Sequence, residues 1–312
     1  MSYQVENGLI NSEACQLNVV DHCNIFCRSC TNLSPAFNER HMDPSEAYEA
    51  LCILAKYYKA ERFRLTGGEP LLHNDLLALV ESVQKSNISS RIYIQTNGIL
   101  LAKMPDDLWS ALDDVIVSQR EDKKITPQSL KLIQEKAELH NVNLEFYSYS
   151  DFVESYSELE TSDETLVKRI YDVCTIKYTY HTVMEGHFYK CPRSYFLPKM
   201  LGIDSSRLNV DGIKIIDSPS FRDDLLAYLE SPTPLYSCRF CLGNVGQMRP
   251  YEDVRRKIWR DFQQKPAEEM IDWKRLTLFE KIAAKRGNNK KQALLSAARL
   301  SAVSFRHFSD ME

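Results

Sequence analysis

The sequence lacks several features that would place it in common classes of protein. Its longest apolar runs, such as residues 76–80, are far too short to cross a membrane. The N-terminus has no basic segment followed by an apolar one, so we expect no signal peptide and a cytoplasmic location. The seven histidines form no HxxxH or HExxH pattern, so no hydrolytic metal site is expected. The chain also contains no internal repeat and no low-complexity segment.

Cysteine, by contrast, is abundant for a chain expected in a reducing compartment. There are nine cysteines, and seven of them fall into two groups. In such a chain this number indicates metal binding or catalysis more than disulfides. The first group is Cys23, Cys27 and Cys30, and the second is Cys174, Cys191, Cys238 and Cys241. Cys15 and Cys52 belong to neither group.

Up to residue 150, short β-branched segments alternate with amphipathic ones. We expect strands at 16–21, 63–65, 91–95, 114–118 and 143–149. We expect helices at 43–58, 74–85, 106–112 and 126–140. This alternation predicts an α/β fold with a parallel sheet or a partial barrel, in which ligands bind at the carboxyl edge of the strands.

After residue 150 the pattern changes, which suggests three parts: 1–150, 151–248 and 249–312. The middle part should hold a helix at 163–171 and a β-hairpin at 178–189, flanked by Cys174 and Cys191. The last part reads as helices at 251–264, 266–285 and 289–303. Residues 242–312 hold 15 Lys or Arg and 9 Asp or Glu. We interpret this basic tail as a solvated helical face, and contact with an acidic or phosphate-bearing partner is the alternative.

Unusual residues follow each of the first four expected strands. They are the three-cysteine loop, the turn Gly67–Pro70 (GGEP), the segment 96–98 (TNG), and the pair Ser118 and Arg120. Thiolates are soft ligands that suit zinc, copper(I) and iron–sulfur clusters. Three thiolates would fill three corners of a cubane cluster and leave the fourth iron open.

This ordered set of motifs resembles the radical S-adenosylmethionine (SAM) enzymes over residues 14–150. The resemblance implies a partial (β/α)5-6 barrel, a 4Fe–4S cluster held by the first three cysteines, and SAM bound at the open iron. It also implies that SAM contacts come from the turns after the strands. The candidate cofactor-binding residues are Phe26, Gly67, Gly68, Glu69, Pro70, Thr96, Asn97, Ser118 and Arg120. Many members have an aromatic residue before the third cysteine; here that residue is Ser29, and Phe26 is the nearby aromatic.

The four later cysteines resemble the twitch form of the SPASM extension in order and spacing. That resemblance implies an auxiliary-cluster module at 151–248, with a second 4Fe–4S cluster fully ligated by Cys174, Cys191, Cys238 and Cys241, and a helical tail at 249–312. A structural zinc site with four thiolates is the main alternative. Four unrelated structural cysteines are a weaker one.

The resemblance also implies a reaction. Reductive cleavage of SAM gives a 5′-deoxyadenosyl radical, which takes hydrogen from the substrate. A fully ligated auxiliary cluster favours oxidation of an alcohol, because it accepts an electron without binding substrate, and the overall architecture resembles radical SAM dehydrogenases that act on aminocyclitols. Epimerisation and peptide (RiPP) maturation are the rivals. Neither Cys15 nor Cys52 is expected at the catalytic edge, which argues against a thiol hydrogen donor, although a tyrosine could serve.

We expect a small polar substrate, such as a sugar, aminocyclitol or glycoside. Because the first barrel strand is expected near residue 16, we expect no N-terminal peptide-recognition domain. The candidate substrate-facing residues are Glu145, Tyr147, Tyr149 and Arg193, of which the first three share one strand face; their alternative role is core packing or ion pairing. We expect an external reductant of the flavodoxin or ferredoxin type and no nucleic acid. A non-catalytic zinc protein that binds a partner through its basic helices is the alternative class.

Overall fold

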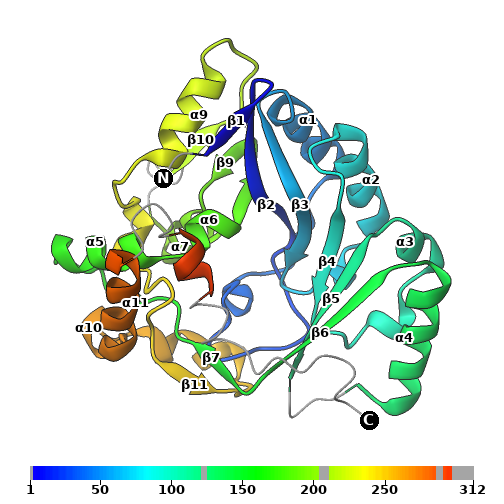
Figure 1. Cartoon of the computed structure of the whole chain (residues 1–312). Coiled ribbons are helices and arrows are strands. Elements are labelled where there is room, and N and C mark those ends of the chain that lie inside the picture. The colour runs from blue at the N-terminus through cyan, green and yellow to red at the C-terminus, as the bar shows by residue number, and fades with distance from the viewer. Residues whose placement is uncertain (1–2, 121–124, 204–210, 286–290, 297–312) are drawn as a thin grey trace.

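The computed structural model describes residues 3–120, 125–203, 211–285 and 291–296. A nine-stranded sheet forms its centre, with the order β10-β9-β8-β2-β3-β4-β5-β6 and β1 paired to β2 (Figure 1). Strands β2 to β6 and β8 are parallel, so the partial α/β barrel expected from the sequence is confirmed. The strands are β1 (Gln4–Glu6), β2 (Leu9–Val20), β3 (Tyr58–Gly67), β4 (Ile92–Thr96), β5 (Asp114–Arg120), β6 (Asn143–Tyr149), β7 (Asp151–Val153), β8 (His181–Met184), β9 (His187–Tyr189), β10 (Gly212–Lys214) and β11 (Met248–Pro250).

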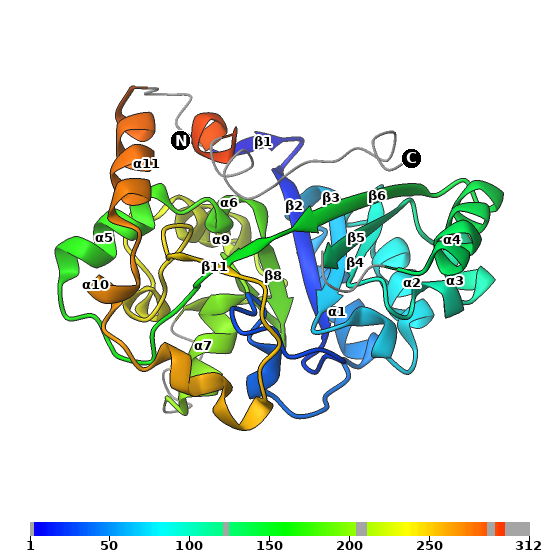
Figure 2. The same ribbon diagram turned by 90° about the horizontal axis from the view of Figure 1, so that it is seen from below.

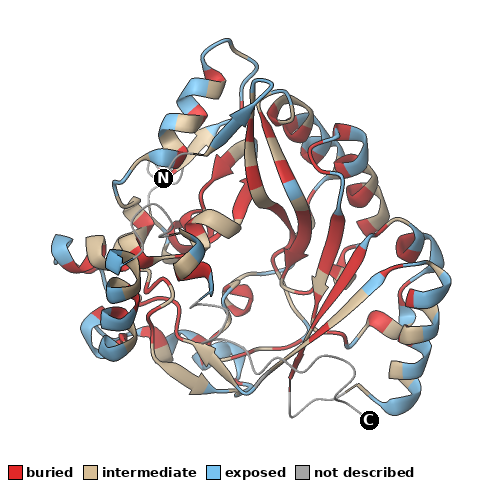
Figure 3. Ribbon diagram, viewed as in Figure 1, coloured by how far each residue is buried: buried red, intermediate tan, exposed pale blue. Residues whose placement is uncertain are grey.

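The helices that follow the parallel strands cover the outer face of the sheet (Figure 1). They are α1 (Pro44–Leu54), α2 (Leu76–Ser86), α3 (Asp106–Ser110) and α4 (Pro127–Leu139). The Asp43 side chain caps α1 by accepting the amides of Ser45 at 2.8 Å and Glu46 at 3.0 Å. Buried residues run along the strands and along the helix sides that face them (Figure 3). The hydrophobic core therefore lies between the outer face of the sheet and the helices, and polar side chains can occupy the inner face.

Strands β8 to β10 extend the sheet beyond β2, and the helices of the C-terminal half lie on that side of the molecule (Figure 1). These helices are α5 (Glu164–Val173), α6 (Ile176–Thr179), α7 (Arg193–Leu201), α9 (Phe221–Glu230), α10 (Ala267–Met270) and α11 (Trp273–Lys285). The expected hairpin is confirmed as β8 and β9, joined by Glu185 and Gly186, which both have positive φ. Because β8 pairs with β2, one sheet crosses residue 150, and the division into parts at that residue remains a prediction.

The sequence-based prediction of a helix at 251–264 was wrong. Residues 251–254 run alongside the three-cysteine loop, where the Arg28 amide donates to Glu252 at 2.9 Å and the Val254 amide donates to Phe26 at 3.0 Å. These bonds engage backbone groups that a helix would need, and only a 3₁₀ segment, η5 (Arg256–Gln263), follows. The helix expected at 266–285 is broken at Ile271, which is extended. Residues 291–296 are helical, and the rest of the helix expected at 289–303 lies outside the described residues.

Across the described ranges, none of the helices combines the length and the apolar character that a membrane crossing needs.

One buried histidine should make stability depend on pH. His181 on β8 is fully buried; its Nδ1 accepts from the Tyr58 hydroxyl at 2.8 Å and its Nε2 donates to the Lys177 carbonyl at 3.2 Å. Burial lowers the pKa of His181 to about 3. The unfolded chain binds this proton below about pH 6.5 and the folded chain does not, so stability falls as pH falls below that value, by up to ~1.4 kcal/mol per unit.

Chemical denaturation between pH 7.5 and 5 measures this slope. The variant His181→Asn should show a shallower slope than the wild type, whatever its stability at neutral pH. Equal slopes would contradict the assignment to His181.

Candidate active site

The three-cysteine loop begins directly after β2, at the carboxyl edge of the sheet. Cys23, Cys27 and Cys30 are free thiols, and the Cys30 amide donates to the Cys27 carbonyl at 3.2 Å. Burial raises the pKa of Cys23 and of Cys27 to about 12, and a negative charge at Cys30 adds to both shifts. Each thiol thus lies within electrostatic range of another in a loop that is partly or fully buried. Three unpaired soft donors of this kind suit an iron–sulfur cluster, whose binding displaces the thiol protons.

The GGEP turn packs directly against the cysteine loop. A Cβ on Gly68 would lie 1.8 Å from the His22 carbonyl oxygen, and one on Gly67 would lie 2.2 Å from that of Val20. The Gly68 amide donates to Val20 at 3.0 Å, and the Glu69 amide donates to His22 at 3.1 Å. The two glycines therefore serve to bring two backbone segments together, in addition to the approach to SAM expected from the sequence.

We expect Gly68→Ala to lower the free energy of unfolding by about 1–3 kcal/mol or more, because the new methyl group would meet backbone atoms that cannot rotate away. Urea denaturation of the unloaded protein measures this loss, and iron content after reconstitution should fall with it. Gly202→Ala is the matched control, since its methyl group would meet no atom within 4 Å and only its left-handed backbone is strained. An equal loss in both variants would contradict the close contact at Gly68.

Glu69 is fully buried and bonded to the next turn. Its carboxylate accepts from the Thr96 hydroxyl at 2.6 Å and from the Asn97 amide at 2.8 Å. Burial raises the pKa of Glu69, while these hydrogen bonds lower it. Glu69 is also one of the residues from which we expect a contact to SAM. In the structure it joins the GGEP and TNG turns, and Pro70 opens the short helix that follows it.

The TNG turn reaches back to the first cysteine. The Asn97 side-chain amide donates to Asn24 at 2.7 Å and lies 3.8 Å from Cys23 Sγ. The structure thus gathers the cysteine loop, GGEP and TNG at one edge of the sheet. The backbone carbonyl of Phe26 accepts from Val254, and its side chain is half-buried.

Arg120, at the end of β5, is held by a segment that the sequence did not place near the site. It is buried, pairs with Asp253 and stacks over the Tyr251 ring at 3.9 Å. The Tyr251 hydroxyl lies 3.0 Å from Cys27 Sγ, and Trp259 Nε1 donates to the Cys27 carbonyl at 2.9 Å. Tyr251, Asp253 and Trp259 were missed because they were assigned to a surface helix. No local sequence signal links them to a loop more than 220 residues away.

Tyr251→Phe should lower the reduction potential of a cluster bound at Cys27. A hydrogen bond to a ligating sulfur favours the more negative, reduced state. A net bond of about 1 kcal/mol corresponds to a decrease on the order of 40 mV for one electron. Redox titration followed by electron paramagnetic resonance measures this, with Tyr48→Phe on the surface of α1 as control. A potential equal to that of the wild type would contradict the contact.

Polar side chains line the inner face of the sheet. Leu17, Leu65 and Ile94 face the helices, so their neighbours Gln16, Arg64 and Gln95 point the other way. Arg64 donates to both glutamines and stacks over the Tyr180 ring at 4.2 Å. The Gln95 side-chain amide in turn donates to Ser118 at 2.9 Å. The sequence prediction named only Ser118 of this network.

On β6, Glu145 and Tyr147 share the inner face as expected. The Tyr147 hydroxyl donates to Glu145 at 2.6 Å, and the Asn143 side chain donates to the same carboxylate at 2.9 Å. Tyr147 pairs in register with Ser118 on β5. Tyr149 lies in β6, and its side chain is outside the described part of the structure.

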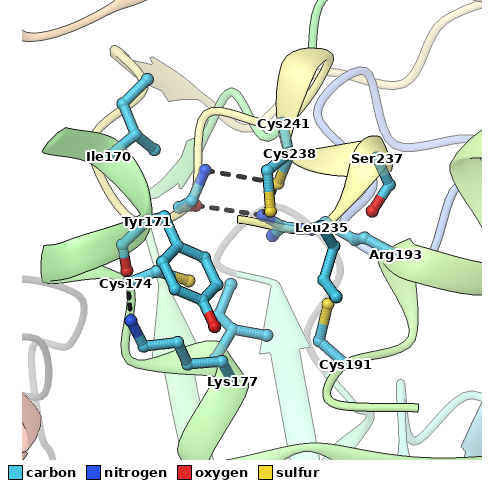
Figure 4. A pocket seen from close by; sticks show the side chains of 12 residues that line it. Ile170, Tyr171, Cys174, Lys177, Cys191, Arg193, Leu235, Ser237, Cys238 and Cys241 are labelled. Carbon is cyan, nitrogen blue, oxygen red and sulfur yellow. Dashed lines mark hydrogen bonds between the residues drawn. The ribbon is translucent and has the colours of Figure 1, made fainter. Parts of the chain in front are cut away.

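The four later cysteines surround one cavity (Figure 4). They come from the end of α5, the segment after β9, and the 3₁₀ segment η4 (Tyr236–Arg239) with the residues after it. The pKa of Cys191 is raised to about 12, mainly by burial and in addition by negative charge on Cys241 and Cys174. The four thiols come from three separate segments of the chain and converge on one cavity, as the sequence predicted.

Arg193 belongs to this second cavity. It is buried, donates to the Gly243 carbonyl at 3.0 Å, and lies 3.5 Å from Cys241 Sγ. Burial lowers its pKa, and the cysteines around it more than offset that effect, so its pKa is raised. We expected Arg193 to face the substrate, and the structure places it against the thiols, where a fixed positive charge suits an anionic centre.

Sequence comparisons with known proteins agree with the first site, formed by the three-cysteine loop and the GGEP and TNG turns. A sequence model of the Radical SAM superfamily matches residues 17–118. The GTP 3′,8-cyclase of Trichodesmium erythraeum is 32% identical over 100 residues, which are 31% of this chain and 30% of that protein. The probable GTP 3′,8-cyclase of Methanothermobacter marburgensis is 31% identical over 128 residues, covering 41% and 40%. The chain therefore spans well under half the length of these curated relatives.

Two solved structures are also similar. The crystal structure of BtrN in complex with AdoMet and 2-DOIA is 18% identical, covers 74% of this chain and 92% of that chain, and has a TM-score of 0.45. Streptococcus suis SuiB bound to S-adenosylmethionine is 14% identical, covers 73% and 68%, and has a TM-score of 0.33. From the family match and the site geometry, we conclude that residues 17–118 form a domain of the radical SAM superfamily, whose cofactors are a 4Fe–4S cluster and S-adenosylmethionine.

Proposed function

We propose that this protein is a radical SAM oxidoreductase that oxidises an alcohol carbon of a small polar substrate. The observation that carries the proposal is the presence of two separate thiol sites in one chain. Three thiols lie at the carboxyl edge of the sheet, and four others surround a second cavity. One site suits radical generation, and the other suits removal of the second electron.

In this proposal the first site holds the cofactors. Cys23, Cys27 and Cys30 would bind the 4Fe–4S cluster, and the GGEP and TNG turns with Arg120 would orient SAM beside it. When bound, the pair supplies a 5′-deoxyadenosyl radical that abstracts a hydrogen atom from the substrate. The chain's own contribution is to hold the turns together through Glu69 and to keep water out of the site.

The inner face of the sheet would bind the substrate. Gln16, Arg64, Gln95 and Ser118 offer several hydrogen-bonding groups in one row, which suits a sugar, aminocyclitol or glycoside. Glu145 is a carboxylate on this face, and it would accept the proton of the reacting hydroxyl, oriented by Tyr147.

Oxidation of an alcohol to a carbonyl removes two electrons and two protons. One electron leaves with the abstracted hydrogen atom, and the hydroxyl proton passes to Glu145. The remaining electron would be taken up at the second site, where Cys174, Cys191, Cys238 and Cys241 would hold an auxiliary 4Fe–4S cluster. The buried guanidinium of Arg193 would favour the added negative charge there.

The position of the spare thiols disfavours an epimerase that returns hydrogen from cysteine. Cys15 is buried in the core on the helix-facing side of β2, and Cys52 lies within α1. Neither reaches the inner face of the sheet. In the experiment below, metal content distinguishes a zinc-binding interaction protein, and cleavage of SAM with no change in any substrate of the panel would favour a peptide maturase.

The test is anaerobic reconstitution followed by incubation with SAM, a reductant and a panel of sugars, aminocyclitols and glycosides. We expect about eight iron atoms per chain, 5′-deoxyadenosine, and a product lighter by two hydrogens. An unchanged mass with uptake of solvent deuterium would show epimerisation instead. A colourless protein that holds only zinc would overturn the proposal, because zinc has a filled d shell and no redox chemistry.

A further inference from the structure

The segment at 251–263 covers the outer side of the three-cysteine loop. Residues 251–254 pair with the loop through the backbone, and buried Trp259 bonds to the Cys27 carbonyl at 2.9 Å. In Figure 2 this gold-orange segment lies beside the blue loop that follows β2. Only one layer of residues therefore separates Cys27 from this surface of the molecule.

The exposed side chains of this segment are mainly cationic. Arg255, Arg256, Lys257 and Arg260 are exposed on and beside η5, and the apolar side chain of Ile258 is 41% exposed among them. Arg260 is paired with Glu158, and Arg256 donates to the carbonyls of Pro35 and Phe37. Over the described ranges, Arg255 and Lys257 take part in no ion pair.

The acidic residues of the same segment are mostly neutralised. Glu252 pairs with Arg28 at 3.1 Å, and Asp253 pairs with Arg120. Asp261 is the exposed acid on η5 itself. The balance leaves a basic surface with an apolar centre, which is the composition of a docking site for an acidic protein.

We propose that this surface, defined by Arg255, Lys257 and Ile258, docks an acidic one-electron carrier protein of the flavodoxin or ferredoxin type. The inference rests on the proposed function, since it names the partner that reduces the first site. The inner side of the cysteine loop faces the GGEP and TNG turns, where SAM and substrate would bind. The outer side at 251–259 is therefore the free approach to Cys27.

The electron count for this step is simple. The reduced carrier loses one electron, which enters at the three-cysteine site and is consumed when one sulfur–carbon bond of SAM breaks to give methionine and the 5′-deoxyadenosyl group. Trp259 and the Cys27 backbone lie between the docked carrier and that site. Charge complementarity would raise the rate of encounter, and this contribution is screened by salt.

The test compares two reductants on the reconstituted full-length protein. One is dithionite, which needs no docking site; the other is an acidic flavodoxin kept reduced by its NADPH-dependent reductase. The variant is the double charge reversal Arg255→Glu with Lys257→Glu. The matched control is Lys103→Glu with Lys131→Glu, which makes the same change of charge at exposed positions by α4, on the other side of the molecule in both views.

We expect the 255/257 variant to form 5′-deoxyadenosine with dithionite at a rate within about twofold of the wild type. With flavodoxin as reductant, the kcat/KM of the variant for flavodoxin should be about tenfold or more below that of the wild type at low salt. Added salt should reduce this difference between variant and wild type, because it screens the charges. The control variant should keep the wild-type response to both reductants.

Two results would overturn the docking surface: an unchanged kcat/KM for flavodoxin, or an equal loss with both reductants. Failure of the proposed function is distinguishable, because the wild type would then form no 5′-deoxyadenosine even with dithionite.

Discussion

The variant Cys27→Ala should form no measurable 5′-deoxyadenosine from SAM. Cys27 is buried, lies within electrostatic range of Cys30, and contacts Tyr251 through its sulfur at 3.0 Å. Removal of residues that merely orient a metal ligand typically costs ten- to a hundredfold in activity or metal affinity, so loss of a direct ligand should cost more than about a hundredfold. Activity would be measured by chromatography and mass spectrometry under strictly anaerobic conditions.

The control for this variant is Cys52→Ala. Cys52 is a half-buried thiol on α1, outside both cysteine groups. It should keep wild-type iron content and SAM cleavage. If Cys27→Ala cleaved SAM as fast as Cys52→Ala does, the assignment of the cluster to the loop after β2 would be wrong.

The variant Cys238→Ala should lose formation of the oxidised product and keep cleavage of SAM. Cys238 lines the second cavity with Cys174, Cys191 and Cys241. Its loss should reduce the iron content from about eight to about four per chain, because one of two four-iron sites loses a ligand. The first site is untouched, so SAM cleavage should continue while formation of the oxidised product stops.

Cys238 is preferred to Cys241 for this test. Cys241 Sγ lies 3.5 Å from the buried guanidinium of Arg193, so its removal would also disturb a buried charge. Cys191→Ser provides a second variant from a different segment of the chain. If both variants kept full product formation, the second site would have no part in the oxidation. If the wild-type protein held about four iron atoms together with zinc on purification, a structural metal at the second site would be the better account.

The sequence predicted the parallel strands well where each was bounded by a turn. The bounds of β6 agree with the expected 143–149, and Pro127 marked the start of α4. The first strand was predicted from residue 16, whereas β2 begins at Leu9. Residues 9–15 include polar and small side chains, and they are extended because they pair with β3, which is a tertiary interaction.

The sequence predicted the residues of the two cysteine sites better than it predicted the partners of the residues around them. The cysteines of each group come together as expected, because the number of cysteines and their spacing along the chain indicate a shared site. The surroundings of Arg120 and Arg193 could not be predicted in this way. Their partners Asp253 and Cys241 lie 133 and 48 residues further along the chain, and only the folded chain brings them together.

The most direct test of the central claim is a single measurement on the reconstituted wild type. Reduced protein is mixed with SAM in the absence of oxygen, and 5′-deoxyadenosine and methionine are quantified. The account predicts both products in equal amounts, from a brown protein whose reduced cluster signal changes when SAM is added. Iron-loaded protein that binds SAM but never releases 5′-deoxyadenosine would contradict it.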